Sequence, residues 1–370
     1  MKTTEAGTIH RLRSTGRKSN GSVSRVLFED PLATEVMIGP GSLSSRDGIE
    51  IHFDRAENLY QKWPTPICII ADGPYGVSGF PGDERRWHTL AEWYAPHIEQ
   101  WSRFSTPQTT LWFWNTEVGW ASVHPILEAN GWEYRTCNIW DKGLSHVAGN
   151  ANTQTLRKFP VVTEVCAHYV KSAKFEVKGQ SLSMQDWLRH EWRRSGLPFR
   201  LANEACGVLN AATRKYLTGD HLWYYPPVDA FVSLAAYANT HGRPEGRPYF
   251  SMDGRQSVPG STWERMRAKF DCPFGVTNVW RLPQVGGAER IQGTRNGMAY
   301  KFKSLHGSQK PLSFMELIVK SSTDPGDMVW EPFGGLCPGA IACHRLKRRY
   351  VAAEIIPEFY QAAIERLNAE

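Results

Sequence analysis

The sequence of 370 residues predicts an α/β fold: an open sheet that carries helices on both of its faces. Short apolar runs of strand length alternate with helical stretches up to about residue 173, and the same alternation returns at Leu312. The stretch between them lacks this order. We therefore expect one sheet domain, made of residues 26–173 and 304–370, interrupted by an insert of residues 174–303.

The first part of the sheet domain is expected to supply four strands. Strands are predicted at residues 67–71, 110–115, 132–140 and 164–170. The first of these is a wholly apolar run that ends in a Gly/Pro-containing loop at residues 72–76. A helical pattern over residues 120–130 is ended by Gly131.

The second part of the sheet domain repeats the pattern. A helix is predicted from Leu312 to about Ser321, followed by a turn at residues 324–327 and a strand at 328–330. A Gly-rich loop, a helix, a strand at residues 350–353 and a last helix from Pro357 complete it. The insert reads as mainly helical, with short helical signals over residues 184–242 and little periodicity after them.

Composition excludes several classes of protein. The chain is 41% hydrophobic and 22% charged, and it lacks the roughly 20 consecutive apolar residues that span a bilayer. Its first 20 residues contain no apolar core of a secretory signal, so the cytoplasm is the expected compartment. None of the seven cysteines forms a C-x-x-C pair, which argues against a disulfide framework or zinc ribbon, and no metal is expected.

Most of the net charge of +6 lies in residues 1–25, a Ser/Gly-containing arm. Its one acidic residue is Glu5, and its basic residues are Lys2, Arg11, Arg13, Arg17, Lys18 and Arg25. Such an arm is typical of a disordered segment, and a polyanion is the usual partner of one that has a function.

The loop after residue 330 has the pattern of a nucleotide-type cofactor site in a Rossmann-like, doubly wound sheet. A strand leads to Gly334 and Gly335, a helix follows, and a second strand ends in Glu354, nineteen residues after Gly335. Glycine lets the backbone approach a ligand closely, and an acidic residue there can accept both hydroxyls of a ribose. A tight turn would also explain the glycine pair, and NAD would fit as well as S-adenosylmethionine.

A second loop decides between these cofactors. Residues 72–75 read D-G-P-Y and resemble the [D/N/S]-P-P-[Y/F] loop of amino-directed DNA methyltransferases, while residues 306–311 resemble their H-x-x-Q-K-P element. The catalytic loop first and the cofactor loop last is the β-class order of that family. Residues 131–142 and 157–171 give further matches. The resemblance implies the class I methyltransferase type of sheet, a target-recognition insert, and S-adenosylmethionine as cofactor with S-adenosylhomocysteine as product.

The resemblance also implies a catalytic role for Asp72, Gly73, Pro74 and Tyr75. An exocyclic base amine is a poor nucleophile, so hydrogen-bond acceptors must hold it while the methyl group arrives in line. The carboxylate of Asp72 and the carbonyl of Gly73 would be these acceptors. Tyr75 would stack on the target base once it is flipped out of the duplex.

A set of eight residues is implied to bind the cofactor: Asp54, His306, Gln309, Lys310, Phe333, Gly334, Gly335 and Glu354. Phe333 and Asp54 would lie near the adenine, and His306 and Lys310 would close over the methionine part. Structural alternatives stay open for each of these. Phe333 could pack in the core, Asp54 could cap a helix, and His306 and Lys310 could make contacts at a helix start before Pro311.

Two departures from the family pattern concern these loops. Gly73 replaces the first proline of the catalytic loop, which removes backbone rigidity because glycine samples far more conformations than proline. The cofactor loop reads E-P-F-G-G-L-C where the family has D-P-F-G-G-[ST]-G, so Glu331 and Cys337 are atypical. Cys337 adds a Cβ atom, and Pro338-Gly339 after it could re-form the turn.

Within the insert, residues 199–217 resemble a helix-turn-helix with its turn at Gly207. Its second helix would present Asn210, Thr213, Arg214 and Lys215 to a major groove. A helical hairpin with a solvated face would look the same. The Arg-rich stretch 243–295 is a second candidate for phosphate contact.

The sequence thus predicts a site-specific methyltransferase acting on duplex DNA inside a bacterial, archaeal or phage-infected cell. Asp at the head of the loop favours adenine N6 as the target, with cytosine N4 as the alternative. A DNA-binding regulator with a degenerate cofactor fold, or a methyltransferase of RNA or of protein glutamine, stays open. A restriction endonuclease of the same system and a second copy of the chain are further candidate partners.

Overall fold

The computed structural model describes residues 39–370 except 78–82, 84–85, 148–154, 245 and 296–297. The basic arm expected at residues 1–25 lies outside the described residues. Within the described part, none of the helices has the length and apolar character needed to cross a bilayer.

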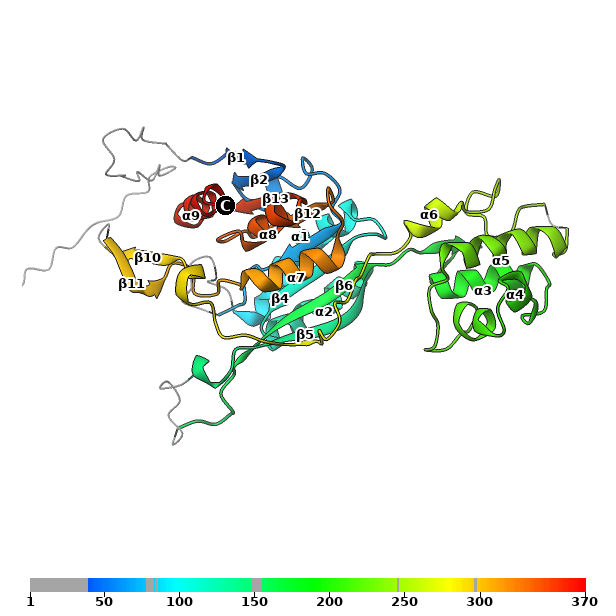
Figure 1. Ribbon diagram of the computed structural model, residues 1–370, viewed down its shortest axis with the longest axis horizontal. Coiled ribbons are helices and arrows are strands. Elements are labelled where there is room, and N and C mark those ends of the chain that lie inside the picture. Colours follow the sequence, from blue (N-terminus) through cyan, green and yellow to red (C-terminus); the bar gives the residue numbers. More distant parts are fainter. Residues whose placement is uncertain (1–38, 78–82, 84–85, 148–154, 245, 296–297) are drawn as a thin grey trace, which may run out of the picture.

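A nine-stranded sheet organises the larger part of the molecule (Figure 1). Its strands are β1 (Ser42–Arg46), β2 (Ile49–Phe53), β3 (Cys68–Ala71), β4 (Thr110–Asn115), β5 (Trp132–Asp141), β6 (Thr163–Lys171), β9 (Val279–Arg281), β12 (Met328–Glu331) and β13 (Arg349–Glu354). They lie in the order β1-β2-β13-β12-β3-β4-β6-β5-β9. The five strands from β2 to β4 are parallel to one another, whereas β6 runs antiparallel to both of its neighbours.

Helices cover both faces of this sheet, which confirms the doubly wound fold. One face carries α1 (Leu90–Phe104) and α2 (Glu117–Ala129); the other carries α7 (Leu312–Ser322), α8 (Pro338–Leu346) and α9 (Pro357–Asn368). Because side chains alternate along a strand, β3 serves both cores. Cys68 and Ile70 pack against the second group of helices, and Ile69 and Ala71 against the first.

The expected elements of the sheet domain are present with shifts of one to three residues at their ends, but α1 was not expected. This helix contains Pro96, which removes a backbone donor and masks the helical pattern. Its buried face consists of Leu90, Tyr94, His97, Ile98 and Trp101. The helix fills the space between the catalytic loop and β4, so it helps to shape the site described below.

A separate helical lobe follows β6 and is joined to the sheet domain by extended segments (Figure 1). It contains the hairpin β7 (Phe175–Val177) and β8 (Gln180–Leu182), and the helices α3 (Met184–Arg194), α4 (Leu201–Ala205), α5 (Val228–His241) and α6 (Gly260–Glu264), with a five-residue π-helix at Ala212–Tyr216. The lobe has its own core, in which the rings of Phe231 and Trp263 stack with centroids 4.0 Å apart.

The lobe is shorter than the insert expected from the sequence. Its core residues run from Phe175 to Met266. The chain then returns to the sheet, where β9 pairs in parallel with β5, so residues 279–281 belong to the sheet domain. This strand was missed because three residues carry no periodic signal. A second hairpin, β10 (Gln292–Arg295) and β11 (Met298–Ser304), precedes α7.

Four short 3-10 helices complete the described structure. They lie at Ala56–Asn58, Trp87–Thr89, Leu144–His146 and Gly287–Glu289.

Candidate active site

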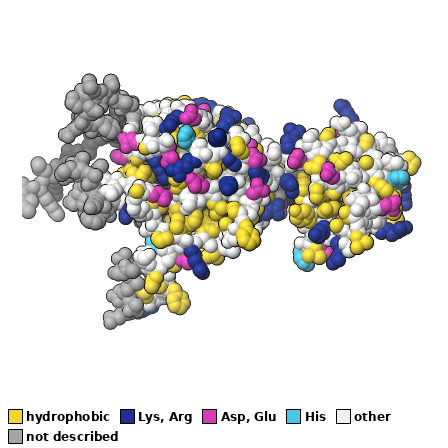
Figure 2. Space-filling view, in the orientation of Figure 1, with side chains coloured by type: hydrophobic (Ala, Val, Ile, Leu, Met, Phe, Trp, Pro, Cys, Tyr) yellow, Lys and Arg dark blue, Asp and Glu magenta, His cyan; other side chains and the backbone are white. Residues whose placement is uncertain are grey.

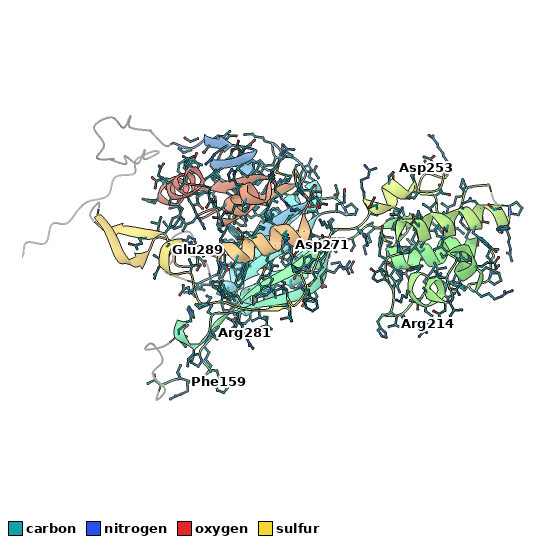
Figure 3. All side chains as sticks on the ribbon, in the orientation of Figure 1. Phe159, Arg214, Asp253, Asp271, Arg281 and Glu289 are labelled. Atoms are coloured by element: carbon teal, nitrogen blue, oxygen red, sulfur yellow. The ribbon has the colours of Figure 1, made fainter. Side chains whose placement is uncertain are left out.

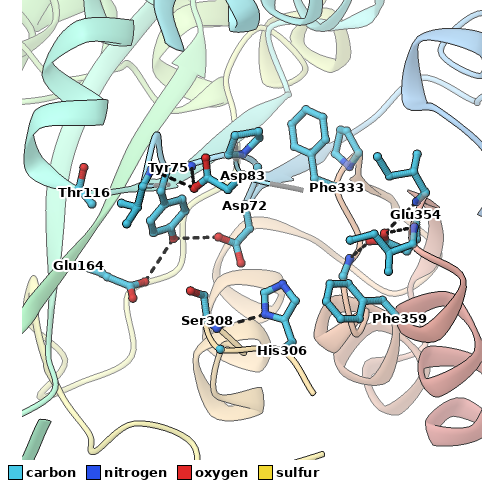
Figure 4. Close-up of a pocket in the computed structure, with 18 of the residues that line it drawn as sticks. Asp72, Tyr75, Asp83, Thr116, Glu164, His306, Ser308, Phe333, Glu354 and Phe359 are labelled. Atoms are coloured by element: carbon cyan, nitrogen blue, oxygen red, sulfur yellow. Dashed lines mark hydrogen bonds between the residues drawn. The ribbon is translucent and has the colours of Figure 1, made fainter. Parts of the chain in front are cut away.

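A cavity of about 480 Å³ opens at the carboxyl edge of the central strands (Figure 4). Its walls come from the loops that follow β3, β12 and β13, together with the segment before α7. The chain winds away from β3 in one direction and from β12 in the other, and these two strands are neighbours. Ligands of doubly wound sheets bind at such a crossover point. The size is ordinary for a small-molecule site.

Glu354 and the glycine pair form one side of this cavity. The Glu354 carboxylate accepts hydrogen bonds from the backbone N–H groups of Gly335 (2.6 Å), Ile355 (2.8 Å) and Ile356 (2.7 Å). Burial raises the pKa of this carboxyl group to about 7, against the three N–H donors that favour its charged form. Gly335 has a left-handed backbone with φ of +54°, which explains the glycine there. The spacing predicted from the sequence therefore brings these residues together.

The catalytic loop forms the opposite side. Asp72 directly follows β3, and its Oδ1 atom accepts a hydrogen bond from the Tyr75 hydroxyl at 2.9 Å. The same oxygen lies 2.9 Å from the Lys310 ammonium. The Tyr75 hydroxyl also lies 3.2 Å from Glu164, which comes from β6 (Figure 4). Burial, and then the nearby carboxylates, raise the pKa of Tyr75 far above its usual value, so its hydroxyl stays a donor.

A buried cluster of charges supports Asp72. Lys310 is fully buried and lies 3.4 Å from Glu164, which also pairs with Lys142. Burial alone would lower the pKa of Lys310, but the carboxylates of Asp72 and Glu164 outweigh it and raise that pKa. Burial likewise opposes the charge of Glu164, and the two lysines lower its pKa. Two carboxylates and two ammonium groups therefore balance one another next to the cavity.

The family model described as DNA methylase matches residues 67–365. This chain belongs to the DNA methylase family of N6 and N4 amino methyltransferases. The resemblance drawn from the two loops is confirmed.

Individual relatives match shorter stretches. Type II methyltransferase M2.MboI of Moraxella bovis is 35% identical over 91 residues, which are 25% of this chain and 29% of the relative. Type II methyltransferase M.Cfr9I of Citrobacter freundii is 31% identical over 85 residues, 23% of this chain and 28% of the relative. The matched segments thus span less than a third of these relatives.

Solved structures resemble the chain over a greater length. The M1.HpyAVI–SAM complex has a TM-score of 0.48 and 16% identity, with 86% of this chain and 99% of that chain covered. The cytosine-N4-specific PvuII DNA methyltransferase has a TM-score of 0.48 and 10% identity, with 86% of each chain covered.

In this member of the DNA methylase family, the two atypical residues of the cofactor loop lie under the loop. Cys337 is 1% exposed and adopts a left-handed backbone, with φ of +45°. A non-glycine residue in that conformation costs about 1–2 kcal/mol. Glu331 accepts hydrogen bonds from the Tyr350 hydroxyl and from the Gly339 N–H at 3.2 Å, and burial raises its pKa to about 8. The turn is preserved, and α8 begins directly after it at Pro338.

The residues of the H-x-x-Q-K-P element have different surroundings: His306 lines the cavity, whereas Gln309 and Lys310 bind other protein groups. His306 lines the cavity as expected, and burial lowers its pKa to about 4, so its ring is neutral at pH 7. Gln309 instead ties down a neighbouring segment: its Nε2 donates to the Glu289 carbonyl at 2.8 Å, and its Oε1 accepts from the Ile291 N–H at 3.2 Å. Lys310 pairs with Asp72. Neither Gln309 nor Lys310 lines the cavity, and both side chains bind protein groups, so the cofactor contact expected of them stays a prediction.

Asp54 and Phe333 both line the cavity, and the contact with the cofactor expected of them stays a prediction. Asp54 lines the cavity, and its Oδ1 accepts hydrogen bonds from the Arg55 N–H (2.7 Å) and the Asn58 side chain (2.8 Å). Phe333 lines the cavity and belongs to an aromatic cluster with Trp93, whose ring centroid is 5.2 Å away. Hydrogen bonds hold Asp54 and aromatic packing holds Phe333 at the wall of the cavity.

The expected helix-turn-helix of the lobe is present only as two short segments. The first, α4, has five residues, and the second is the five-residue π-helix Ala212–Tyr216, so the two helices expected within residues 199–217 cover only part of that range. Thr213 fastens these segments together, since its N–H and hydroxyl bond with the Asn203 side chain at 3.1 Å. The sequence pattern alone cannot give the length of a helix.

Three of the four residues assigned to DNA contact are exposed: Asn210, Arg214 and Lys215. Arg214 lies on the outer surface of the lobe (Figure 3). The space-filling view shows further Lys and Arg side chains on the lobe and where it joins the sheet domain (Figure 2). This distribution leaves cationic groups available to a polyanion.

Sequence motifs alone did not reveal several residues of the site. Lys142 and Glu164 lie within the two secondary matches to the family, at residues 131–142 and 157–171, so a signal existed for them. Tyr94 and Asn115, which both donate to the Pro74 carbonyl at 3.1 Å, lie outside any of the motifs. Among the described residues, no group of three or more His, Cys, Asp or Glu side chains is arranged to hold a metal ion.

Proposed function

We propose that this protein transfers a methyl group from S-adenosylmethionine to an exocyclic amine of a base in duplex DNA, and that adenine N6 is the target. The observation that carries this proposal is the arrangement of the cavity. A carboxylate suited to ribose hydroxyls, Glu354, and a carboxylate suited to an amine, Asp72, face one cavity from neighbouring loops. Membership of the DNA methylase family supports the reaction class.

The residues of the first side fit the cofactor. Glu354 is 6% exposed, and as a carboxylate it can accept both hydroxyls of a ribose. A Cβ atom on Gly335 would lie 3.5 Å from the His306 ring and would fill the space between the loop and that ring. Phe333 offers an aromatic face for adenine. When bound, S-adenosylmethionine supplies an electrophilic methyl group on a positively charged sulfur.

The residues of the catalytic loop would hold the target amine in position for attack on the methyl group. Asp72 and the Gly73 carbonyl accept hydrogen bonds from the amino group, which directs its lone pair toward the methyl carbon. The new N–C bond forms as the C–S bond breaks, and the amine then loses a proton to Asp72 or to water. Lys310 holds the Asp72 carboxylate in position from the buried side. Tyr75 stacks on the flipped base, and its hydroxyl gives up its bond to Asp72 when the amine arrives.

Transfer of labelled methyl groups to unmethylated DNA tests this proposal. We expect labelled N6-methyladenine after hydrolysis of the DNA. Label in N4-methylcytosine would assign the alternative target, for which the Asp at the head of the loop is the less usual residue. Binding of DNA without any transfer would favour the regulator, and label found only in RNA or in protein glutamine would exclude DNA as the substrate.

The helical lobe is proposed to recognise the target sequence, with double-stranded DNA as the partner. Arg214 would contact a base edge and Lys215 a phosphate, because both are exposed and cationic. Binding of cognate and mismatched duplexes at two salt concentrations separates these roles. Arg214→Ala should reduce discrimination at one position of the site, and Lys215→Ala should weaken binding to all sequences and flatten its salt dependence.

The proposed setting is the cytoplasm, where DNA is accessible. Two relatives carry the name Type II methyltransferase, which supports a restriction endonuclease as the companion of this protein. A homodimer is a further proposal. Sedimentation of the purified chain with and without duplex DNA tests it.

A further inference from the structure

One carboxylate outside the sequence motifs fixes the backbone of the catalytic loop. Asp83 accepts hydrogen bonds from three successive N–H groups of that loop, those of Tyr75 (2.8 Å), Gly76 (2.9 Å) and Val77 (3.3 Å). Its side chain lines the cavity beside Tyr75 (Figure 4). Successive N–H groups that converge on one anion form a tight and directional contact.

The loop needs such a contact because of Gly73. A Cβ atom at this position would lie 2.6 Å from the Tyr94 hydroxyl and 2.7 Å from the Phe333 ring, so the close packing excludes any residue with a side chain. Glycine leaves the backbone free to sample many conformations. The stiffness that a proline would give the loop must therefore come from its surroundings.

Two kinds of contact make the catalytic loop rigid, one at each end of the loop. Tyr94 and Asn115 hold the Pro74 carbonyl with neutral hydrogen bonds. Asp83 holds the N–H groups that follow with a charged acceptor, and charge-assisted hydrogen bonds are roughly twice as strong as neutral ones. Asp83 is 9% exposed, so water competes weakly for its oxygens.

We propose that Asp83 is a positioning residue for methyl transfer: it fixes the loop backbone so that Asp72 and Tyr75 meet the target base in a reactive geometry. This proposal rests on the function proposed for that loop. Asp83 itself acts through Tyr75, Gly76 and Val77 and does not need to touch the base. Misplacement of a reacting group by about 1 Å can cost a hundredfold in rate, so the effect should be large.

The test compares Asp83→Ala and Asp83→Asn with the wild type in single-turnover transfer of labelled methyl groups, at saturating S-adenosylmethionine and DNA. Asp83→Ala should lower the rate about ten- to a hundredfold. Asp83→Asn should fall between the two, because its carbonyl oxygen can still accept from part of the loop. The dissociation constant of S-adenosylmethionine, measured by calorimetry, should stay within about twofold, since Glu354 and Gly335 are untouched.

Asp253→Ala is the matched control. In the helical lobe, Asp253 also binds successive backbone N–H groups, those of Arg255 (2.8 Å) and Gln256 (3.1 Å), but it lies far from the cavity (Figure 3). Its removal should leave the single-turnover rate at saturating DNA within about twofold of the wild type. If the rate falls in the Asp83 variants but not in Asp253→Ala, the loss comes from the catalytic loop and not from removing any carboxylate that binds a loop backbone.

Two results would overturn the positioning role. If Asp83→Ala and Asp83→Asn both transfer methyl groups at the wild-type rate while Asp72→Ala does not, the loop acts as proposed but does not depend on Asp83. If the Asp83 variants lose cofactor affinity as strongly as they lose rate, Asp83 supports the whole cavity and not the catalytic loop alone. Wild-type activity of Asp72→Ala would instead overturn the proposed function of the loop.

Discussion

The catalytic loop and the cofactor loop differ in what holds them, although both follow neighbouring parallel strands and both depart from the family pattern. The cofactor loop is held within its own strand-helix-strand unit: the Cys337 N–H donates to the Gly334 carbonyl at 2.7 Å, the Gly334 N–H to the Ala353 carbonyl of β13 at 2.8 Å, and the Gly335 N–H to the Glu354 carboxylate at 2.6 Å. The catalytic loop is held by side chains from elsewhere in the chain, above all Asp83 and Lys310.

This difference decides how each loop tolerates an atypical residue. Cys337 is accommodated within the turn that it belongs to, at the cost of a left-handed backbone. The backbone around Gly73 is held instead by Asp83, Tyr94 and Asn115, which lie outside the sequence motifs. A motif that looks incomplete can therefore be complete in the structure, provided that outside side chains replace the missing rigidity.

Removal of the buried ammonium group should have a large effect. Lys310→Met leaves Asp72 and Glu164 facing each other without a cation between them, and breaking a buried charge cluster typically costs about 3–5 kcal/mol of stability. We expect methyl transfer to fall by a hundredfold or more, while the dissociation constant of S-adenosylmethionine changes by less than about threefold. Lys320→Met, at an exposed position of α7, the helix that begins two residues after Lys310, is the control. If Lys310→Met instead loses cofactor affinity and keeps a normal transfer rate, Lys310 contributes to cofactor binding.

Restoring the family residue should harm the catalytic loop. In Gly73→Pro, the added ring carbons would meet the Tyr94 hydroxyl and the Phe333 ring at less than 3 Å, as a Cβ atom already does. We expect transfer to fall more than tenfold, with a lower melting temperature. A variant as active as the wild type would mean that Phe333 and Tyr94 move aside easily, and that the loop does not depend on outside contacts.

Cofactor binding should depend on pH through Glu354. Burial raises the pKa of this group to about 7, and the charged form is the one that accepts two hydroxyl hydrogen bonds. Affinity should therefore rise with pH through 7, with a dissociation constant about tenfold higher at pH 6 than at pH 8. Calorimetry across this range measures it. The same titration with Glu354→Gln should lose this pH dependence, and an unaltered profile in that variant would assign it to another group.

The smallest effect is expected at Cys337. Cys337→Gly relieves a left-handed backbone worth about 1–2 kcal/mol, but it loses a buried side chain and gains unfolded-state freedom of about 0.5–1 kcal/mol. These changes offset one another, so the free energy of unfolding should stay within about 1 kcal/mol of the wild type. Denaturant unfolding checks this. A large loss of stability would show that the thiol does more than fill space.

The sequence predicted those parts of the site that depend on local order along the chain. The glycine pair and Glu354 are brought together by one strand-helix-strand unit, so their spacing was sufficient. The pairing of Lys310 with Asp72 was not predicted, because spacing cannot say on which side of a cavity a residue near a helix start will lie. Asp83 was missed because its three bonds are made to backbone N–H groups, which leave no trace in residue types.

Prediction of the fold from the sequence was limited in the same way, to elements with a clear local pattern. Strands with long apolar runs, such as β3 and β4, were predicted within a residue. The three-residue β9 and the proline-containing α1 were not, since tertiary packing and not local pattern stabilises them. The sequence predicted two helical segments within residues 199–217 but not where they end, because the end of a helix depends on contacts such as Asn203 with Thr213.

The most direct test of the whole account is single-turnover methyl transfer by Asp72→Ala at saturating S-adenosylmethionine, with cofactor affinity measured on the same preparation. The variant loses a positioned acceptor for the amine, worth about 3 kcal/mol of transition-state stabilisation, and keeps the cofactor side intact. We predict a rate at least a hundredfold lower than that of the wild type and a dissociation constant within about twofold. A rate within a few-fold of the wild type would contradict the assignment of the catalytic loop.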